Sequence, residues 1–367
     1  MTENFPEYVQ ENVPLAPLTT MGVGGSSRYF ASIKDTNRLV EVLNIAARSG
    51  LKTYIIGQGS NLLVADTGFD GLVIKPENRQ IEHLSKAEDF AIFRVGAGLP
   101  WDEFVAYAVA QKHTGIACMS GIPGMVGACP IQNIGAYGQE VAGIIHKVHV
   151  LDRTNYKNLV FKKGECGFAY RMSNFKTCWQ NKYVITAVEF QMPFAHEETI
   201  RYPELKKRLG IQEGSAIPPL TEIREMVLSI RREKSMIYST SDPNSISAGS
   251  FFVNPVVPIR VAENIEKKLR LENFPSYPAG DGKVKLSTAF LIENAGFAKG
   301  YIRGNAGLSA KHVLAIINRG GAKTSDILDL ATEICATVRD KFGVRLVLEP
   351  NMLGFKNVEK NWPVLFA

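Results

Sequence analysis

The feature that most constrains this chain is an uncharged, glycine-rich segment at residues 114–138. It reads TGIACMSGIPGMVGACPIQNIGAYG and contains six glycines but no Asp, Glu, Lys or Arg. A surface loop is normally polar, because its backbone groups and side chains face water. We therefore expect this segment to be buried against another part of the protein or against a ligand.

A second glycine turn, GQGSN, lies at residues 57–61. Glycine adopts positive φ readily and lets several backbone N–H groups approach one anion. Together with residues 121–127, this turn predicts a clamp for a pyrophosphate, although tight turns in a β-rich domain would need glycines too. No GxGxxG or GxxxxGK[ST] pattern is complete, which disfavours a Rossmann nucleotide fold and a P-loop.

Composition limits the class of protein. The 367 residues suffice for two or three domains, and 45% apolar with 21% charged residues is typical of globular proteins. The 42 basic and 36 acidic residues give a net charge of +6, which is scattered and fits an anionic small molecule as well as a nucleic acid. Five cysteines without a CxxC pair, no secretory leader and no long apolar run predict a cytoplasmic protein with reduced thiols.

Periodic apolar residues predict the main helices. The first is expected between a cap at Asp35 or Thr36 and a stop at Gly50. Its apolar stripe consists of Leu39, Val42, Leu43, Ala46 and Ala47. Two further helices are expected, one starting at Pro100 with Trp101, Phe104, Val105 and Ala108 inward, the other bearing Ile223, Met226, Val227 and Ile230. A domain boundary is expected near the end of the latter.

Strands are expected at 53–56, 71–75, 91–98, 146–152, 183–192 and 344–348. We expect the last third of the chain to be mostly helical. Ser287, Ser309 and Ser325 are predicted helix caps there, and Gly320 and Gly343 are predicted helix ends.

Seven strings give the chain a resemblance to a known family, that of UDP-N-acetylenolpyruvoylglucosamine reductase (UDP-N-acetylmuramate dehydrogenase). They occur in the order of the family and span residues 19–350. The strings are TTMGVGG (19–25), IGQGSNLLVAD (56–66), SGIPGMVGACPIQNIGAYGQE (120–140), YRMSNFK (170–176), AGSFFVNP (248–255), KLSTAFLIENAGFAKG (285–300) and LEP (348–350).

The resemblance implies an α+β chain with a two-subdomain FAD-binding fold of the vanillyl-alcohol-oxidase type. A C-terminal α+β domain would bind the substrate. The implied division is 1–76 for the first FAD-binding subdomain, 77–232 for the second and 233–335 for the substrate domain, with 336–367 returning to the first.

The family uses non-covalent FAD, with NADPH as the hydride donor. By position in the matching strings, the implied FAD-binding residues are Gly57, Gln58, Gly59, Ser60, Asn61, Leu62, Ser120, Gly121, Ile122, Pro123, Gly124, Val126, Gly127, Ala128, Asn133 and Gly135. The glycine-rich segment would then be buried because it lies under the flavin.

The implied reaction reduces an enolpyruvyl ether to a lactyl ether. Hydride addition to the β-carbon leaves negative charge on the α-carbon and its carboxylate, which needs cations or hydrogen-bond donors and a proton source. Arg171 matches the residue that holds the carboxylate, because a guanidinium binds it at two points. Glu349 matches the protonated acid that stabilises the enol, and Ser250 matches the proton donor to the α-carbon.

Substrate contacts also carry over by position. The implied residues are Tyr137, Tyr170, Arg171, Tyr202, Lys234, Asn254 and His312. Tyr202, in RYPEL, resembles the tyrosine that one subclass folds over the nucleotide. Lys234 would hold the diphosphate; the spacing from it to Ser250 is longer than in the family version it otherwise matches, so Arg232 or Lys283 could share that task.

Two other functions stay open at this point. A flavin-linked oxidase of the same fold would carry its flavin on a His or Cys near the glycine turns, with His113, Cys118 and Cys129 as candidates. A sugar-nucleotide sensor without turnover would keep the pocket, but the presence of Ser250, Arg171 and Glu349 argues against it. We expect no metal, since His146 and His149 point to opposite faces of a strand. We further expect a monomer that binds a UDP-sugar substrate, does not bind nucleic acid and does not insert into a membrane.

Overall fold

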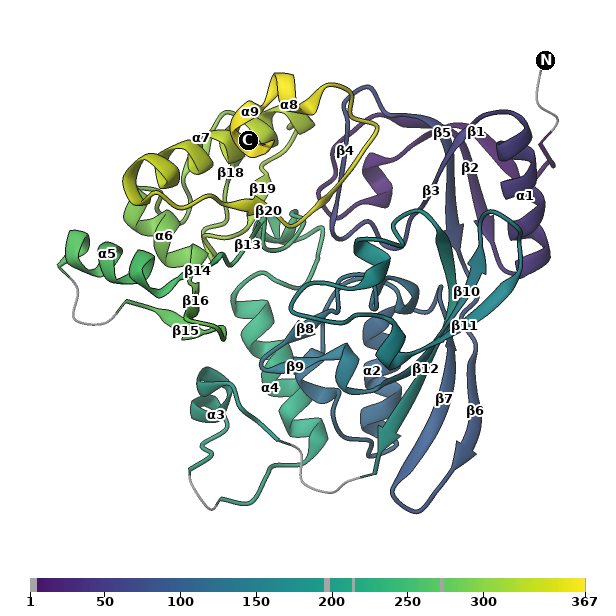
Figure 1. The fold of residues 1–367 in the computed structure, drawn as a ribbon, viewed down its shortest axis with the longest axis horizontal. Coiled ribbons are helices and arrows are strands. Elements are labelled where there is room, and N and C mark those ends of the chain that lie inside the picture. Colours follow the sequence, from purple (N-terminus) through teal and green to yellow (C-terminus); the bar gives the residue numbers. More distant parts are fainter. Residues whose placement is uncertain (1–4, 195–198, 213–214, 271–273, 367) are drawn as a thin grey trace. The chain divides into compact units, whose positions relative to one another are not determined.

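The structure is a computed structural model that describes residues 5–194, 199–212, 215–270 and 274–366. It divides the chain into two compact units, which we call unit 1 and unit 2. Unit 1 contains Met1–Val13, Ser27–Gln58 and Asp70–Ile237, and unit 2 contains Pro14–Ser26, Gly59–Phe69 and Tyr238–Ala367. Each unit therefore combines segments that are distant in sequence, and Figure 1 labels most of their helices and strands.

The first sheet of unit 1 has the strand order β1-β2-β5-β3, with β3 and β5 parallel. Its strands are β1 (Val9–Pro14), β2 (Ser26–Ile33), β3 (Lys52–Ile55) and β5 (Phe69–Pro76). Helix α1 (Thr36–Arg48) packs its buried residues against this sheet, and the Asp35 side chain caps it by accepting a hydrogen bond from Arg38 N at 2.9 Å. The predicted cap and apolar stripe are confirmed, apart from Ala47, which is exposed.

The second sheet of unit 1 is antiparallel, with the order β11-β10-β12-β7-β6. Its strands are β6 (Ile81–Lys86), β7 (Phe90–Gly96), β10 (Ile145–Asp152), β11 (Asn158–Lys162) and β12 (Tyr183–Pro193). Helix α2 (Trp101–Ala110) packs on this sheet through Trp101, Phe104 and Val105, which are fully buried.

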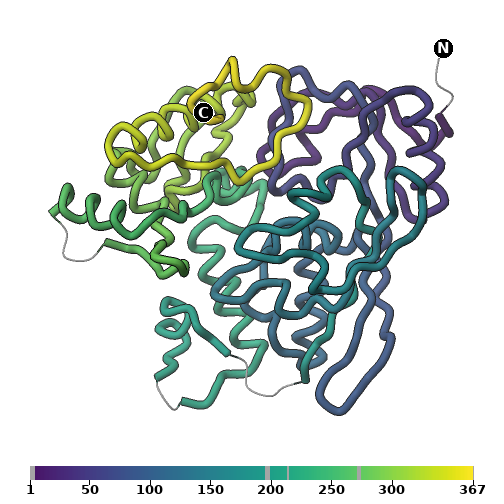
Figure 2. Tube along the Cα trace, viewed as in Figure 1, coloured from purple at the N-terminus to yellow at the C-terminus, as the bar shows by residue number. Residues whose placement is uncertain are grey.

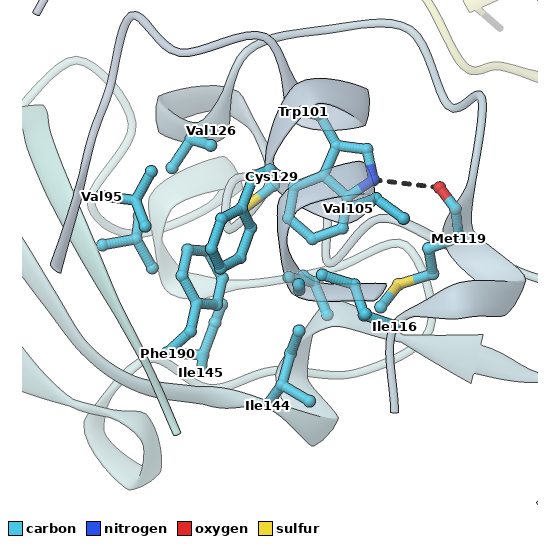
Figure 3. Packing of buried hydrophobic residues seen from close by; sticks show 14 of the residues in the cluster. Val95, Trp101, Val105, Ile116, Met119, Val126, Cys129, Ile144, Ile145 and Phe190 are labelled. Atoms are coloured by element: carbon cyan, nitrogen blue, oxygen red, sulfur yellow. Dashed lines mark hydrogen bonds between the residues drawn. The ribbon is translucent and has the colours of Figure 1, made fainter. Parts of the chain in front are cut away.

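The glycine-rich segment 114–138 is part of the same core, as its lack of charge predicts. Ile116, Cys118 and Met119 are fully buried, and the Trp101 indole N–H donates to the Met119 carbonyl at 3.0 Å (Figure 3). The segment ends in a short hairpin of β8 (Gly135–Ala136) and β9 (Gln139–Glu140). Helices α3 (Pro203–Arg208) and α4 (Leu220–Glu233) complete unit 1.

Unit 2 is built from short strands and a few helices around one hydrophobic core. Its helices are α5 (Ile259–Leu269), α6 (Thr288–Ala295), α7 (Thr324–Phe342), α8 (Val358–Asn361) and α9 (Pro363–Phe366). Its strands are β4 (Leu62–Val64), β13 (Phe252–Val253), β14 (Val256–Pro258), β15 (Ser276–Pro278), β16 (Lys283–Leu286), β17 (Ile302–Arg303), β18 (Ala306–Leu308), β19 (Ile316–Asn318), β20 (Val347–Leu348) and β21 (Asn351–Leu353).

The end of the chain closes unit 2 against an early segment. Strand β21 pairs in parallel with β4, setting Asn351 opposite Leu62. Figure 2 shows the C-terminal part of the chain, in yellow, passing alongside the segment that contains β4. The side chain of Asp66 accepts hydrogen bonds from the first two N–H groups of α7, those of Thr324 and Ser325, at 2.7 and 3.1 Å.

Some predictions for the last third are wrong. Ser287 does cap α6 and Gly343 does end α7 in the left-handed region. Ser325, however, lies inside the first turn of α7, and Ser309 and Gly320 lie in loops beside β18 and β19. The region also carries many strands of two to four residues, which are too short for a periodic sequence pattern to reveal.

The division into three domains stays a prediction. The boundary expected near residue 232 lies six residues before the start of the C-terminal segment of unit 2 at Tyr238. The boundary expected at residue 335 falls within helix α7.

Candidate active site

The turn at Gly57–Asn61 offers backbone donors. Gly59 has a φ of +60°, and a Cβ added there would lie 2.3 Å from the Leu18 carbonyl oxygen, so only glycine fits. Within the described part of the chain, the N–H groups of Gly57, Gln58 and Gly59 donate to no intrachain acceptor. Consecutive N–H groups without internal partners suit an anion. A pyrophosphate therefore fits this turn.

The turn at Ser120–Ala128 is built differently, because its N–H groups are largely used within unit 1. The acceptors are Ala117 O for Ser120, Asp102 Oδ1 for Gly121, Gln58 Oε1 for Gly124, Leu99 O for Val126, Ala97 O for Gly127 and Met125 O for Ala128. A Cβ at Gly127 would lie 2.6 Å from the Ala97 Cβ, so this glycine is needed for packing. Cofactor contacts from this turn stay a prediction.

Two charged residues that sequence reasoning missed hold this second turn. Asp102 accepts from Gly121 N at 2.6 Å and from both terminal nitrogens of Arg224 at 2.7 Å. Burial opposes ionisation of Asp102, but the hydrogen bonds from Arg224 and Gly121 hold the pKa of its carboxyl below the usual value. Arg231 is only 6% exposed, and its Nε donates to the Gly121 carbonyl at 3.1 Å. These contacts fix Gly121 on both sides.

Tyr137 lies at the tip of the β8–β9 hairpin with a φ of +48°. Burial raises the pKa of its hydroxyl to about 12, although Arg231, which is hydrogen-bonded to it, acts in the opposite direction. Arg231 also donates to the Met236 carbonyl at 3.0 Å. One buried guanidinium thus joins the second glycine turn, the hairpin and the end of α4.

Arg171 stands in a tight turn beside that hairpin. Ala169 and Met172 exchange two backbone hydrogen bonds of 3.1 Å around Tyr170 and Arg171, and Arg171 has a φ of +53°. Its guanidinium donates to the Gly135 carbonyl at 3.1 Å and lies 5.5 Å from the Tyr170 ring centroid. The structure therefore brings Arg171 to the hairpin that bears Tyr137.

The buried side chain of Asn133 connects the Arg171 turn to the neighbouring backbone through hydrogen bonds. Its side-chain amide donates to the Ala169 carbonyl at 3.1 Å and to Glu140 at 2.8 Å, and its oxygen accepts from Ala142 N at 3.0 Å. The side chain is 1% exposed and is engaged within the protein. Its observed role is to position the Arg171 turn, while the implied FAD contact stays a prediction.

Tyr202 and Lys234 meet the same region of unit 1. The Tyr202 ring lies edge-on to the Tyr137 ring, with centroids 5.3 Å apart. Lys234, at the end of α4, donates to both carboxylate oxygens of Glu204 at 2.8 and 2.6 Å. Arg232, an alternative for the diphosphate, is exposed on α4.

Unit 2 brings Ser250 and Glu349 together. Strands β13 and β20 are antiparallel, with Phe252 opposite Leu348. The backbone pairing continues by one residue beyond the strands, because Glu349 N donates a hydrogen bond to the Phe251 carbonyl at 3.0 Å. Ser250 and Glu349 therefore lie on adjacent backbone segments, and both are half-buried.

Asn61 joins the first glycine turn to this pair. Its side-chain amide donates to the Glu349 carbonyl at 3.3 Å, and its own carbonyl accepts from Asn351 N at 3.0 Å. The two predicted catalytic residues of unit 2 and a predicted cofactor residue are thus neighbours.

The remaining residues of unit 2 that are predicted to bind substrate lie on separate elements of the unit. Asn254 uses its side-chain oxygen to accept from Thr288 N at the start of α6, at 3.0 Å. His312 is half-buried in the loop between β18 and β19 rather than on a helix. Lys283, the other alternative for the diphosphate, is exposed on β16.

The candidates for a covalent flavin link are buried. His113 is 2% exposed between the rings of Phe93 and Phe194, and burial lowers the pKa of its imidazole. Cys118 and Cys129 are also buried, and burial raises the pKa of the Cys129 thiol. A buried, protonated thiol is a poor nucleophile.

Among the described residues, every helix is too short or too polar to span a membrane. The same residues hold no group of three or more His, Cys, Asp or Glu side chains that could bind a metal ion.

The chain is an FAD-binding protein, since a sequence model of the FAD binding domain matches residues 27–155. A model of the C-terminal domain of UDP-N-acetylenolpyruvoylglucosamine reductase matches residues 242–353. The chain belongs to the UDP-N-acetylenolpyruvoylglucosamine reductase family, because it is 44% identical to the Thermobifida fusca enzyme of that name over 96% of this chain and 99% of that protein.

Other relatives agree. The reductase of Cutibacterium acnes is 40% identical over 94% of this chain and 90% of that protein. The fold matches the crystal structure of the reductase from Thermus caldophilus with a TM-score of 0.63 and 23% identity, covering 93% of this chain and 97% of that one. The predicted fold class, an FAD-binding fold with a C-terminal substrate domain, is confirmed.

Proposed function

We propose residue roles for the reaction of this family. The chain is an FAD-dependent enzyme that reduces the enolpyruvyl ether of UDP-N-acetylglucosamine enolpyruvate to UDP-N-acetylmuramate in peptidoglycan synthesis, with NADPH as hydride donor. The observation that carries the residue roles is the arrangement in unit 2, where Glu349 is hydrogen-bonded to Asn61 and to the residue after Ser250.

Bound FAD would supply the redox chemistry that links NADPH to the β-carbon of the enolpyruvyl group. We assign its pyrophosphate to the turn at Gly57–Asn61, whose first three N–H groups have no acceptor within the described chain. Leu62 and the segment from Ser120 to Gly135 are proposed to line the rest of the cofactor site. In that segment Asp102 and Arg231 hold Gly121 in place.

Arg171 is proposed to hold the carboxylate of the enolpyruvyl group. The tight turn, the bond to the Gly135 carbonyl and the Tyr170 ring restrict the guanidinium before substrate arrives. A restricted guanidinium loses little freedom on binding and can stabilise charge that develops on the carboxylate.

Ser250 is proposed to give its proton to the α-carbon, and Glu349 to stabilise the enol in its protonated form. A hydroxyl is a weak acid, so proton transfer from Ser250 depends on neighbouring groups. The β13–β20 pairing supports this assignment, since it keeps the two residues on adjacent segments.

The nucleotide part of the substrate is assigned to unit 1 residues around the hairpin. Tyr137, Tyr202 and Lys234 are gathered there, and Tyr170 lies next to Arg171 in its turn. Asn254 and His312 are proposed to contact the substrate from unit 2.

Tyr202 gives a prediction about binding. Replacing Tyr202 with alanine should raise the KM for the UDP-sugar substrate by roughly three- to tenfold and leave kcat within about twofold, because a side chain that covers the nucleotide contributes binding more than chemistry. Tyr202→Phe should show a smaller rise in KM. Steady-state kinetics measure both, with Tyr277→Ala, an exposed tyrosine of unit 2, as control. An unchanged KM for the alanine variant would remove the assignment.

An anaerobic titration tests the function. The flavin absorbance near about 450 nm should bleach on addition of NADPH and recover when UDP-N-acetylglucosamine enolpyruvate is added without oxygen. Recovery only after air is admitted would indicate an oxidase. A purified protein without flavin would contradict the cofactor assignment.

We further propose that the protein acts in the cytoplasm as a monomer and does not bind nucleic acid. The buried free thiols of Cys118, Cys129, Cys166 and Cys335 support the cytoplasmic location, since a reducing compartment keeps thiols free. Analytical ultracentrifugation of the holoenzyme would measure the oligomeric state.

A further inference from the structure

The ammonium group of Lys234 is already neutralised inside unit 1. Its Nζ lies 2.8 and 2.6 Å from the two carboxylate oxygens of Glu204, and the two side chains are 33% and 34% exposed. These two contacts use two of the three N–H donors of the ammonium group, so a second anion must share Lys234 with Glu204 or displace it.

Glu204 is brought to Lys234 by the same segment that carries Tyr202. It lies in the first turn of α3, two residues after Tyr202, whose ring meets Tyr137. The other end of α3 is joined to α4 by an independent ion pair between Arg208 and Glu233. The carboxylate therefore reaches Lys234 from a helix that is anchored at both ends.

This arrangement conflicts with simultaneous binding of a diphosphate by Lys234. A carboxylate and a diphosphate are both anions, so their close approach at one ammonium group is repulsive. Glu204 must either leave Lys234 or weaken the binding of the incoming ligand.

We propose that Glu204 is an internal competitor for the diphosphate of the nucleotide ligand and thereby sets the affinity of the site for nucleoside diphosphates. The proposal rests on the proposed function, because it takes Lys234 as the residue that binds the diphosphate. Separating the Lys234–Glu204 ion pair lowers the free energy gained when the ligand binds. For a pair that is about one-third exposed, we expect the affinity to change about three- to tenfold.

The test measures the dissociation constant of UDP for the oxidised holoenzyme by isothermal titration calorimetry. Glu204→Gln keeps the size of the side chain and removes its charge, so it should tighten UDP binding about three- to tenfold. Lys234→Gln should weaken it at least tenfold. In the double variant the Glu204 substitution should have no further effect, because the lysine for which it competes is absent.

Glu233→Gln is the matched control. It removes a carboxylate from the other ion pair between α3 and α4 and leaves Lys234 with its partner. If Glu204 acts only by anchoring α3, both glutamine variants should weaken UDP binding alike. If it competes for Lys234, only Glu204→Gln should tighten binding.

The outcomes separate this inference from the proposed function. Unchanged or weaker UDP binding in Glu204→Gln, with weaker binding in Lys234→Gln, would overturn the competition and leave the role of Lys234 in place. Unchanged binding in Lys234→Gln would overturn the assignment of the diphosphate to Lys234, and the competition with it. Tightening by Glu204→Gln in the absence of Lys234 would also contradict competition.

Discussion

Replacing Ser250 with alanine is expected to slow reoxidation of the reduced enzyme by the enolpyruvyl substrate by a factor of about 10²–10⁴. Flavin content and bleaching by NADPH should stay within about twofold of the unmodified protein. The reason is that the hydroxyl is proposed to act only on the α-carbon, after hydride addition to the substrate. Stopped-flow absorbance under anaerobic conditions measures the two half-reactions separately.

Ser325→Ala is a suitable control for this experiment. Ser325 lies in the first turn of α7, within the same unit. Its replacement also removes a serine hydroxyl but does not alter the β13–β20 pair. Both half-reactions should keep their rates in this variant. If Ser250→Ala slowed the two half-reactions equally, the proton-donor role would be wrong, and a structural role in the loop before β13 would remain.

Replacing Arg171 with alanine is the second large change that we expect. It should cost about 3 kcal/mol of transition-state stabilisation, which corresponds to a fall in kcat/KM of roughly 150-fold. The guanidinium is proposed to neutralise the charge that grows on the substrate carboxylate. Steady-state kinetics with the enolpyruvyl substrate measure the change, and FAD content should not fall.

Two further variants sharpen this prediction. Arg171→Lys keeps the charge but loses the two-point geometry, so it should recover only part of the lost rate. Lys182→Ala removes an exposed cation from the same stretch of unit 1 and should leave kcat/KM unchanged. Near-full turnover in Arg171→Ala would refute its role at the carboxylate.

The long helices could be predicted from the sequence because each repeats an apolar residue over several turns. Leu39, Val42 and Leu43 show this in α1, and Ile223 and Val227 show it in α4. The strands of unit 2 are harder to predict, since they hold two to four residues and two of their pairs, β13–β20 and β4–β21, join distant segments of the chain. Strand β4 is the extreme case, because its partner β21 lies at the other end of the sequence.

The roles of the candidate site residues stay predictions, but the structure shows which of these residues lie close together. Ser250, Glu349 and Asn61 stand in three separate strings, and the structure makes them neighbours. Arg231 was missed because it lies among the charged residues that end α4. Arg231 lies four residues after Val227, on the buried face of α4, and this spacing is the feature of the sequence that indicates a buried side chain. Nothing in the spacing of Asp102 or Glu204 indicates their partners.

The pairing of β4 with β21 has a consequence for the newly made protein. Asn61, just before β4, and Glu349, just before β21, are 288 residues apart in the chain. At about 5–20 residues per second, a ribosome needs roughly 15–60 s to make that stretch. During this time the edge of β4 lacks its partner, and open strand edges attract other chains. Asn61 and Glu349 can therefore meet only after residue 349 has been made, and until then the edge of β4 is open to pairing with other chains.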